Sequence, residues 1–176
     1  APGPGRMAAG AGSTMVDDAG GRRRIVFLDM DGTLVDFATG VARIDPDVAT
    51  PYLARDHPDE IPGVYALMDP MPGAVEAFAR LAERFDAYIL STAAWHNPSA
   101  WTDKLEWVQR RWGAGEDSPA YKRLILSHHK DLNRGDVLID DNAMHGAAQF
   151  QGEWIRFGSP EFPDWDAVLR RLLPPH

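Results

Sequence analysis

Two pairs of acidic residues have spacings that could serve catalysis. Asp29 and Asp31 are separated by one residue in the run DMDGT, and Asp140 is followed directly by Asp141. Carboxylates that crowd together repel one another, so such a group needs a hard cation that prefers oxygen ligands. Mg²⁺ suits an Asp29 and Asp141 pair, because it takes few protein carboxylates and keeps positions for water and a substrate phosphate. The acidic pairs therefore predict a magnesium site.

Two hydroxyl groups and a lysine could complete a phosphoryl-binding set. Ser91 and Thr92 follow one apolar run, and Lys130 follows another after a short Ser-His-His link. Hydroxyls and an ammonium group can hydrogen bond to phosphoryl oxygens and offset their negative charge. Each residue alone is typical of a turn or a solvated surface. Their occurrence in one order along the chain predicts a pocket for a phosphoryl group.

These residues can act together only if the fold brings them to one place. Five short apolar runs predict strands, and helical periodicity between several of them indicates βαβ units. We therefore expect an α/β fold, a Rossmann-like parallel sheet flanked by helices, with ligands bound beyond the carboxyl ends of its strands. The candidate residues all lie at or just beyond such ends. The predicted strands are 25–28, 87–90, 124–126, 137–139 and 154–157.

Three segments have the apolar spacing of amphipathic helices. The first covers residues 73–84. Pro98 can begin the second and Gly113 can end it, and Asp164 can cap the third. A short helix is also expected after Asn142. The apolar residues of the three helices are, in turn, Val75, Phe78, Ala79 and Ala82; Trp101, Leu105, Val108 and Trp112; and Trp165, Val168, Leu169 and Leu172.

Two segments depart from this alternation. Residues 1–21 hold six Gly, five Ala and two Pro, with hardly any large apolar side chain, which predicts a disordered leader before a single domain over 22–176. Residues 36–70 are rich in Pro and Asp and lack a clear strand. We interpret this stretch as a small cap, inserted after the first strand and placed over the site.

Composition excludes several classes of partner and chemistry. The chain has 176 residues and no cysteine, so thiol nucleophiles, disulfides and thiolate zinc sites are excluded, and a cytoplasmic location is the default. A net charge of −8 argues against binding to a nucleic-acid polymer. No apolar run approaches the ~20 residues of a membrane span, so no membrane partner is expected.

The candidate residues resemble the four motifs of the haloacid-dehalogenase-like hydrolase superfamily: D-x-D-G-T, a Ser or Thr after the second strand, a Lys and an acidic pair. More narrowly, the runs DMDGTLVDF, MPGAVEAF, YILSTAAWHNPSAW and LILSHHK followed by VLIDDN resemble the type C 5′(3′)-deoxyribonucleotidase family and its bacterial relatives. The resemblance covers residues 24–173. It implies a hydrolase domain, and the relatives suggest a homodimer.

The resemblance also implies a role for each motif residue. Asp29 is the expected nucleophile, which forms a phosphoaspartate. Asp31 is the expected general acid and later the base that activates water. Mg²⁺ is expected on Asp29, on the backbone carbonyl of Asp31 and on Asp141, with Asp140 acting through water or a supporting hydrogen bond. The expected ligands of the transferred phosphoryl group are Ser91, Thr92 and Lys130.

The implied reaction is Mg²⁺-dependent hydrolysis of a phosphomonoester. Relatives that act on carbon–halogen bonds or pump ions lack an acid at the position of Asp31, whereas phosphatases have Asp there. Phe37 stands where the deoxyribonucleotidases carry an aromatic residue that stacks on the base, and Tyr65 or Trp95 could add to that pocket. We therefore expect a small phosphorylated substrate such as a deoxynucleoside monophosphate.

Two alternatives use the same residues. The first is a phosphatase of another small metabolite, such as a sugar phosphate, because the segment between Phe37 and Met68 is too short to align with the cap of the better-known deoxyribonucleotidases. The second is a phosphoacceptor receiver domain, although a receiver carries its acidic pair on the first strand. Lys104 is expected to be a solvated helix residue. His128 and His129 are expected to be structural, because zinc-site spacing is lacking.

Overall fold

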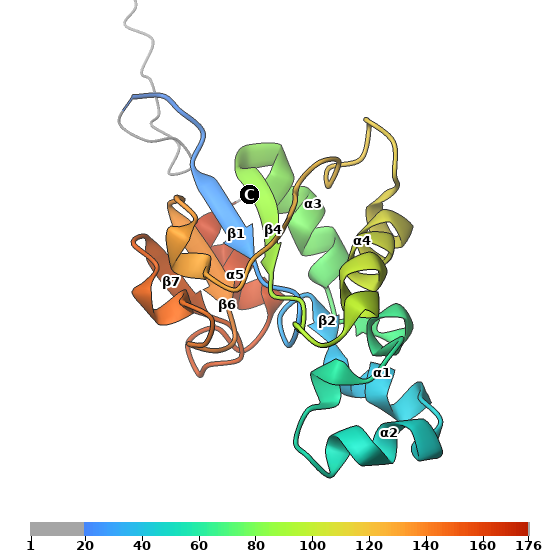
Figure 1. Ribbon diagram of the computed structural model, residues 1–176. Coiled ribbons are helices and arrows are strands. Elements are labelled where there is room, and N and C mark those ends of the chain that lie inside the picture. Colours follow the sequence, from blue (N-terminus) through green and yellow to red (C-terminus); the bar gives the residue numbers. More distant parts are fainter. Residues whose placement is uncertain (1–19, 176) are drawn as a thin grey trace, which may run out of the picture.

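A five-stranded parallel sheet lies at the centre of the computed structural model, which describes residues 20–175. Its strand order is β5-β4-β1-β6-β7, so the chain moves outward from β1 to β5 and then returns to the other side of β1 (Figure 1). This confirms the predicted α/β fold. Residues 1–19 of the expected leader lie outside the described residues. The strands are β1 Ile25–Leu28, β4 Asp86–Ser91, β5 Leu124–Leu126, β6 Val137–Asp140 and β7 Glu153–Arg156.

Alternating side chains along the strands form two apolar clusters, one on each face of the sheet. Val26 and Leu28 of β1 belong to the larger cluster, which packs against α3 (Ala74–Arg84), α4 (Pro98–Trp112) and α5 (Trp165–Leu172). Phe27 belongs to the smaller cluster, with residues of the connection between β6 and β7. That connection includes the 3₁₀ helix η4 (Ala147–Gln149), where a short helix after Asn142 was expected. Burial on both faces is what a parallel sheet requires.

The three expected helices are present, but two of them bury a different stripe. Trp101 and Leu105 of α4 are 38% and 46% exposed. α4 packs against both the sheet and the segment 59–68, so its buried arc is set by two neighbours and not by one apolar face. In α5 the predicted stripe is buried, and Asp164 caps the helix. The buried residues are Ala74, Ala77, Phe78 and Leu81 in α3, and Ala100, Lys104, Trp107 and Val108 in α4.

No helix within residues 20–175 is both long enough and apolar enough to cross a membrane.

The segment 36–70 begins and ends on a short antiparallel ribbon. β2 (Val35–Asp36) pairs with β3 (Asp69–Pro70), where no clear strand was expected, because two-residue strands are too short to show alternation. The helices of this segment are α1 (Phe37–Arg43), α2 (Pro46–Leu53), η1 (Pro58–Glu60) and η2 (Val64–Leu67). Of these, α1 and α2 lie below β2 in Figure 1.

Side chains of α4 and of the turn before it hold the second half of this segment. The amide nitrogen of Asn97 donates to the carbonyl oxygens of Asp59 and Ile61, at 3.0 and 3.1 Å. The indole nitrogen of Trp107 donates to the carbonyl oxygen of Met68, at 2.8 Å. Both side chains are buried, where such bonds are costly to leave unmade. The segment 59–68 is therefore tied to the sheet domain through α4.

Candidate active site

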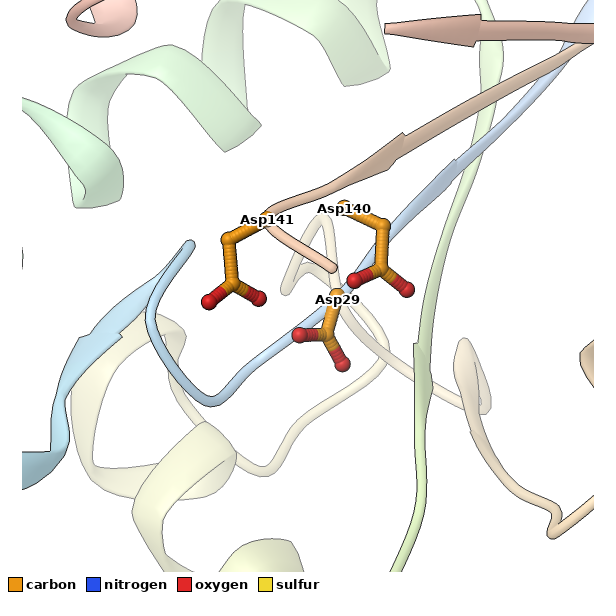
Figure 2. A group of neighbouring side chains, drawn as sticks. All are labelled: Asp29, Asp140 and Asp141. Atoms are coloured by element: carbon orange, nitrogen blue, oxygen red, sulfur yellow. The ribbon is translucent and has the colours of Figure 1, made fainter. Parts of the chain in front are cut away.

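The acidic residues from the first and fourth predicted strands meet at the carboxyl edge of the sheet. β1 and β6 are neighbours in register, and the backbone N–H of Asp29 donates to the carbonyl oxygen of Ile139, at 2.9 Å. This pairing brings Asp29 beside Asp140 and Asp141. Each of the three offers a carboxylate oxygen, and these oxygens lie within 4.8 Å of one another. Figure 2 shows the three side chains converging from the ends of β1 and β6.

A tight turn after Asp29 shapes the other side of this group. The carbonyl oxygen of Met30 accepts from the backbone N–H groups of three residues that follow it, so the chain folds back on itself. Gly32 has a φ of +77° in this turn, and a Cβ there would lie 2.4 Å from Oδ2 of Asp141. Glycine is therefore required at this position by its backbone conformation and by the close carboxylate.

Lys130 makes two ion pairs beneath the acidic group. Its Nζ lies 2.8 Å from Oδ1 of Asp29 and 2.5 Å from Oδ2 of Asp140, and all three side chains are buried. Lys130 begins the 3₁₀ helix η3 (Lys130–Leu132), and its backbone N–H donates to the carbonyl oxygen of His145. Burial lowers the pKa of Lys130, but Asp29 and Asp140 raise it further, so the net shift is upward and the side chain is an ammonium ion.

The expectation for Lys104 was wrong. Its side chain is fully buried, and its Nζ donates to Oγ of Ser91 at 2.7 Å, to the carbonyl oxygen of Thr92 at 2.6 Å and to Oδ2 of Asp31 at 3.1 Å. Lys104 lies on the buried stripe of α4, whereas the apolar spacing had predicted a buried stripe one residue further along. A lysine in phase with Ala100, Trp107 and Val108 was the signal that could have revealed it.

The hydroxyl pair after β4 divides between two environments. Ser91 is fully buried behind the site, where its oxygen accepts from Lys104. Thr92 lines a cavity above the acidic group. Its hydroxyl donates to the carbonyl oxygen of Ser127 at 2.8 Å, and this bond joins the loops after β4 and β5. The backbone of Thr92 also accepts from Lys104. This lysine thus links the hydroxyl pair to Asp31.

A cavity of about 580 Å³ opens above these groups. Tyr65 and Trp95, two of the predicted pocket residues, line it, and the ring of Trp95 is 75% exposed. Phe37 is not among the lining residues; it packs edge-on against Tyr65 at 5.7 Å between ring centroids. His128 also lines the cavity, and its ring contacts the rings of Trp95 and Trp101. The wall is made by Asp29, Asp31, Asp56, His57, Pro58, Asp59, Tyr65, Thr92, Ala94, Trp95, His128, Lys130, Asn142, Met144 and His145.

The electrostatics of the site fit a divalent cation. Four carboxylates, from Asp29, Asp31, Asp140 and Asp141, face the two ammonium groups of Lys104 and Lys130. Burial raises the pKa of Asp29, and the charges of Asp140 and Asp31 add to the rise while Lys130 opposes it. Burial and the charge of Asp140 raise the pKa of Asp141 to about 6. With all four carboxylates ionised, the group would have two negative charges in excess, which a Mg²⁺ ion would balance.

Asp141→Asn is expected to stabilise the metal-free protein at pH 8. The pKa of Asp141 is raised to about 6 in the folded protein from its ordinary value of 3.8, so an ionised carboxylate at this position costs free energy above about pH 6. Below about pH 4 the group is protonated in the folded and unfolded chains, and the cost disappears. Thermal unfolding in EDTA should show the variant melting above the wild type at pH 8, with the difference shrinking as the pH falls.

Added Mg²⁺ should reverse this order at pH 8. A ligand that binds only the folded chain raises its stability, so the wild type should gain more from Mg²⁺ than a variant lacking one carboxylate. Asp166→Asn, an exposed carboxylate on α5, is the matched control and should show neither effect. Equal gains from Mg²⁺ in the wild type and Asp141→Asn would contradict a metal site at this residue.

Comparison with known proteins gives a family match over residues 52–170, to the family described as 5′ nucleotidase, deoxy (Pyrimidine), cytosolic type C protein. A protein of Vibrio phage KVP40, provisionally assigned as a 5′(3′)-deoxyribonucleotidase, is 52% identical over 148 residues, which cover 84% of each chain. The human 5′(3′)-deoxyribonucleotidase, cytosolic type, is 28% identical over 172 residues, with 82% of this chain and 78% of the human protein covered. These matches confirm the resemblance that the motifs indicate.

A solved structure is also similar to the chain. A Bacillus subtilis protein provisionally described as a HAD hydrolase, crystallised with magnesium, matches 85% of this chain and 98% of its own, with a TM-score of 0.56 and 12% identity. At this level of identity the similarity concerns the fold alone. It agrees with the Rossmann-like sheet described above.

Proposed function

Because the chain belongs to the family of cytosolic type C deoxy (pyrimidine) 5′-nucleotidases, and is therefore a phosphomonoester hydrolase, we propose that it removes the phosphate group from deoxynucleoside monophosphates. The observation that carries this proposal is the convergence of Asp29, Asp31 and Lys130 on one cavity at the carboxyl edge of the sheet. A nucleophile, a proton donor and a phosphoryl ligand are thereby within reach of one small substrate.

In the first step, Asp29 attacks phosphorus. Lys130 binds Oδ1 of Asp29, so we assign Oδ2 as the attacking oxygen. A bond forms between Oδ2 and phosphorus while the bond from phosphorus to the ester oxygen breaks, which leaves a phosphoaspartate. Lys130 and Thr92 line the cavity and are assigned to the phosphoryl oxygens, with the Thr92 hydroxyl turning from the carbonyl oxygen of Ser127 to donate to the substrate. Lys104 and Ser91 lie behind them and support this wall.

Asp31 acts in both steps. In the first step it gives a proton to the leaving alcohol, and in the second step it takes a proton from the water that attacks the phosphoaspartate. The bond between phosphorus and Asp29 breaks, and inorganic phosphate leaves. Asp31 can serve both steps because its side chain lines the cavity and is only partly buried.

Asp29, Asp141 and the backbone carbonyl of Asp31 are the proposed ligands of Mg²⁺. A bound ion would supply positive charge that offsets the repulsion of the nucleophilic carboxylate and the phosphate. Asp140 is fully buried and engages Lys130 and the backbone N–H of Asn142, at 3.1 Å to the latter. We therefore assign Asp140 to orienting Lys130 and the loop after β6, and not to direct coordination.

The segment 36–70 is proposed to act as a cap that selects the substrate. Its residues Asp56, His57, Asp59 and Tyr65 form one wall of the cavity, opposite the loops after the strands. The exposed ring of Trp95 offers an aromatic surface at the same cavity, on which a nucleobase could stack. Phe37 supports this wall through its contact with Tyr65.

A substrate panel tests the proposal. Phosphate release should be measured from dUMP, dTMP, the matching ribonucleotides and several sugar phosphates, with Mg²⁺ and with EDTA. We expect Mg²⁺-dependent release, with the highest kcat/KM for a deoxynucleoside monophosphate. A higher kcat/KM for a sugar phosphate would contradict the nucleotide assignment, whereas release that is unaffected by EDTA would contradict the metal assignment.

A further inference from the structure

Two polar side chains that line the cavity have no partner within residues 20–175. His145 lies on the loop after β6, and Asp59 lies in η1 on the wall formed by the segment 36–70. Neither the imidazole of His145 nor the carboxylate of Asp59 makes a hydrogen bond or an ion pair with the described part of the chain. Both groups can therefore bind a ligand without breaking an existing bond.

The backbone holds both residues in place although the ends of their side chains are unbonded. The carbonyl oxygen of His145 accepts from the backbone N–H of Lys130 at 2.8 Å, and that of Asp59 accepts from the side-chain amide of Asn97 at 3.0 Å. His145 has a φ of +54°, which is uncommon for residues other than glycine. Backbone conformations of this kind cluster at functional sites. Both side chains are thus presented to the cavity from fixed positions.

Electrostatic effects place the two groups close to the proposed phosphoryl ligand. Burial and the charge of Lys130 lower the pKa of His145, whereas the charge of Asp59 acts in the opposite direction. The imidazole is therefore neutral in slightly alkaline solution, with one N–H donor and one acceptor nitrogen. Burial raises the pKa of Tyr65, and the charges of Asp31 and Asp59 add to the rise. Asp59 and His145 therefore flank the space beside Lys130 and Asp31.

A hydroxyl group has the chemistry that fits this pair. A carboxylate only accepts hydrogen bonds, whereas a neutral imidazole can donate one, and a hydroxyl can donate to the first and accept from the second. The hydroxyl of Tyr65 on the same wall is already engaged, since it donates to Oδ2 of Asp31 at 3.1 Å. A second anionic group is disfavoured, because the carboxylate of Asp59 would repel it. A substrate hydroxyl next to the phosphate would therefore complete the pair.

We propose that Asp59 and His145 are specificity-determining residues that bind the 3′-hydroxyl of the deoxyribose, with Asp59 as the acceptor and His145 as the donor. This inference rests on the proposed function, in which the substrate is a deoxynucleoside monophosphate with its phosphate on the 5′ oxygen. The sugar is the part of such a substrate that lies next to the phosphate, which fits a pair beside Lys130. The pair recognises the sugar and leaves the base to other residues, such as Trp95.

A substrate that lacks only this hydroxyl tests the assignment. dTMP and 2′,3′-dideoxythymidine 5′-monophosphate have the same base and the same phosphate ester, and they differ only at the 3′ position. The quantity to measure is the ratio of their kcat/KM values with Mg²⁺. We expect the wild type to favour dTMP at least about ten-fold, because the analogue leaves a polar pair without its hydrogen bonds.

Variants of the pair should remove this preference. Asp59→Ala and His145→Asn should each lower the ratio about three-fold or more, and the double variant should bring it to about one. Asn tolerates the left-handed backbone of His145, and both changes keep the backbone bonds from Lys130 and Asn97. The controls are Asp166→Asn and His96→Asn, two exposed residues that do not line the cavity, and they should keep the wild-type ratio.

The ratio separates recognition of the hydroxyl from general damage. A wild-type ratio near one, or equal losses on both substrates in the double variant, would overturn this inference, because effects on folding or on phosphate binding do not depend on the 3′-hydroxyl. In either case, Mg²⁺-dependent release of phosphate from dTMP would leave the proposed function standing. A wild-type chain that releases no phosphate from any deoxynucleoside monophosphate would instead overturn the proposed function, and this inference with it.

Discussion

Asp29→Asn is expected to lower kcat for phosphate release by ~10⁴-fold or more while leaving the fold intact. The amide is a poor nucleophile and cannot form the acyl phosphate that divides the reaction into two steps. The variant should not unfold, because Lys130 keeps its ion pair with Asp140 and the crowded acidic group loses one charge. Steady-state assays with the best deoxynucleotide of the panel, paired with thermal unfolding, measure both effects.

Two matched variants separate chemistry from charge at this position. Asp29→Glu keeps the negative charge but moves the carboxylate by one methylene, and it should be nearly as inactive, since attack on phosphorus depends on position. Asp166→Asn removes an exposed carboxylate from α5 and should retain full activity. Substantial turnover by Asp29→Asn would show that a different group attacks phosphorus.

Lys130→Met is expected to have the largest combined effect on activity and stability. The change removes the ammonium that we assign to the phosphoryl group, and it leaves the buried carboxylates of Asp29 and Asp140 without their partner. Breaking a buried ion pair from one side costs ~3–5 kcal/mol. We therefore expect the free energy of unfolding at pH 8 to fall by about that amount, with kcat/KM falling by about 10²–10³-fold.

Urea unfolding gives the free energy of unfolding, and steady-state kinetics under the same conditions give kcat/KM; together they test this prediction. Lys122→Met is the control, because its side chain is exposed on the loop before β5 and faces none of the site carboxylates. The destabilisation by Lys130→Met should be smaller at low pH, where protonation of the raised-pKa carboxyl of Asp29 removes a charge that lacks a partner. A variant as stable as the wild type at pH 8 would contradict the role given to this buried pair.

Much of the sheet and its functional edge could be predicted because local patterns determine them. Short apolar runs mark strands that are buried on both faces, and a parallel sheet places their carboxyl ends together. That is why Asp29 and Asp141, more than a hundred residues apart in sequence, were expected at one place and are found there. Asp164 likewise caps the last helix as its type and position indicate.

Other features depend on tertiary neighbours that no local pattern records. In α4 the predicted apolar stripe and the buried one lie one residue apart. Packing against the segment 59–68 selects the stripe that contains Lys104. The bond between Tyr65 and Asp31 likewise depends on the position of that segment, to which Asn97 and Trp107 donate hydrogen bonds. Phe37 was expected to stack on the nucleobase. It does not line the cavity and packs against Tyr65 of the same segment.

Trapping the phosphorylated chain tests directly whether Asp29 is the nucleophile. Asp31→Asn, which lacks the base for the second step, should be mixed with 4-nitrophenyl [³²P]phosphate and Mg²⁺, quenched in acid and mapped by peptide. We predict a burst of 4-nitrophenol that approaches the enzyme concentration, with the label on Asp29. Turnover without any label on the protein, or a label on another residue, would contradict it.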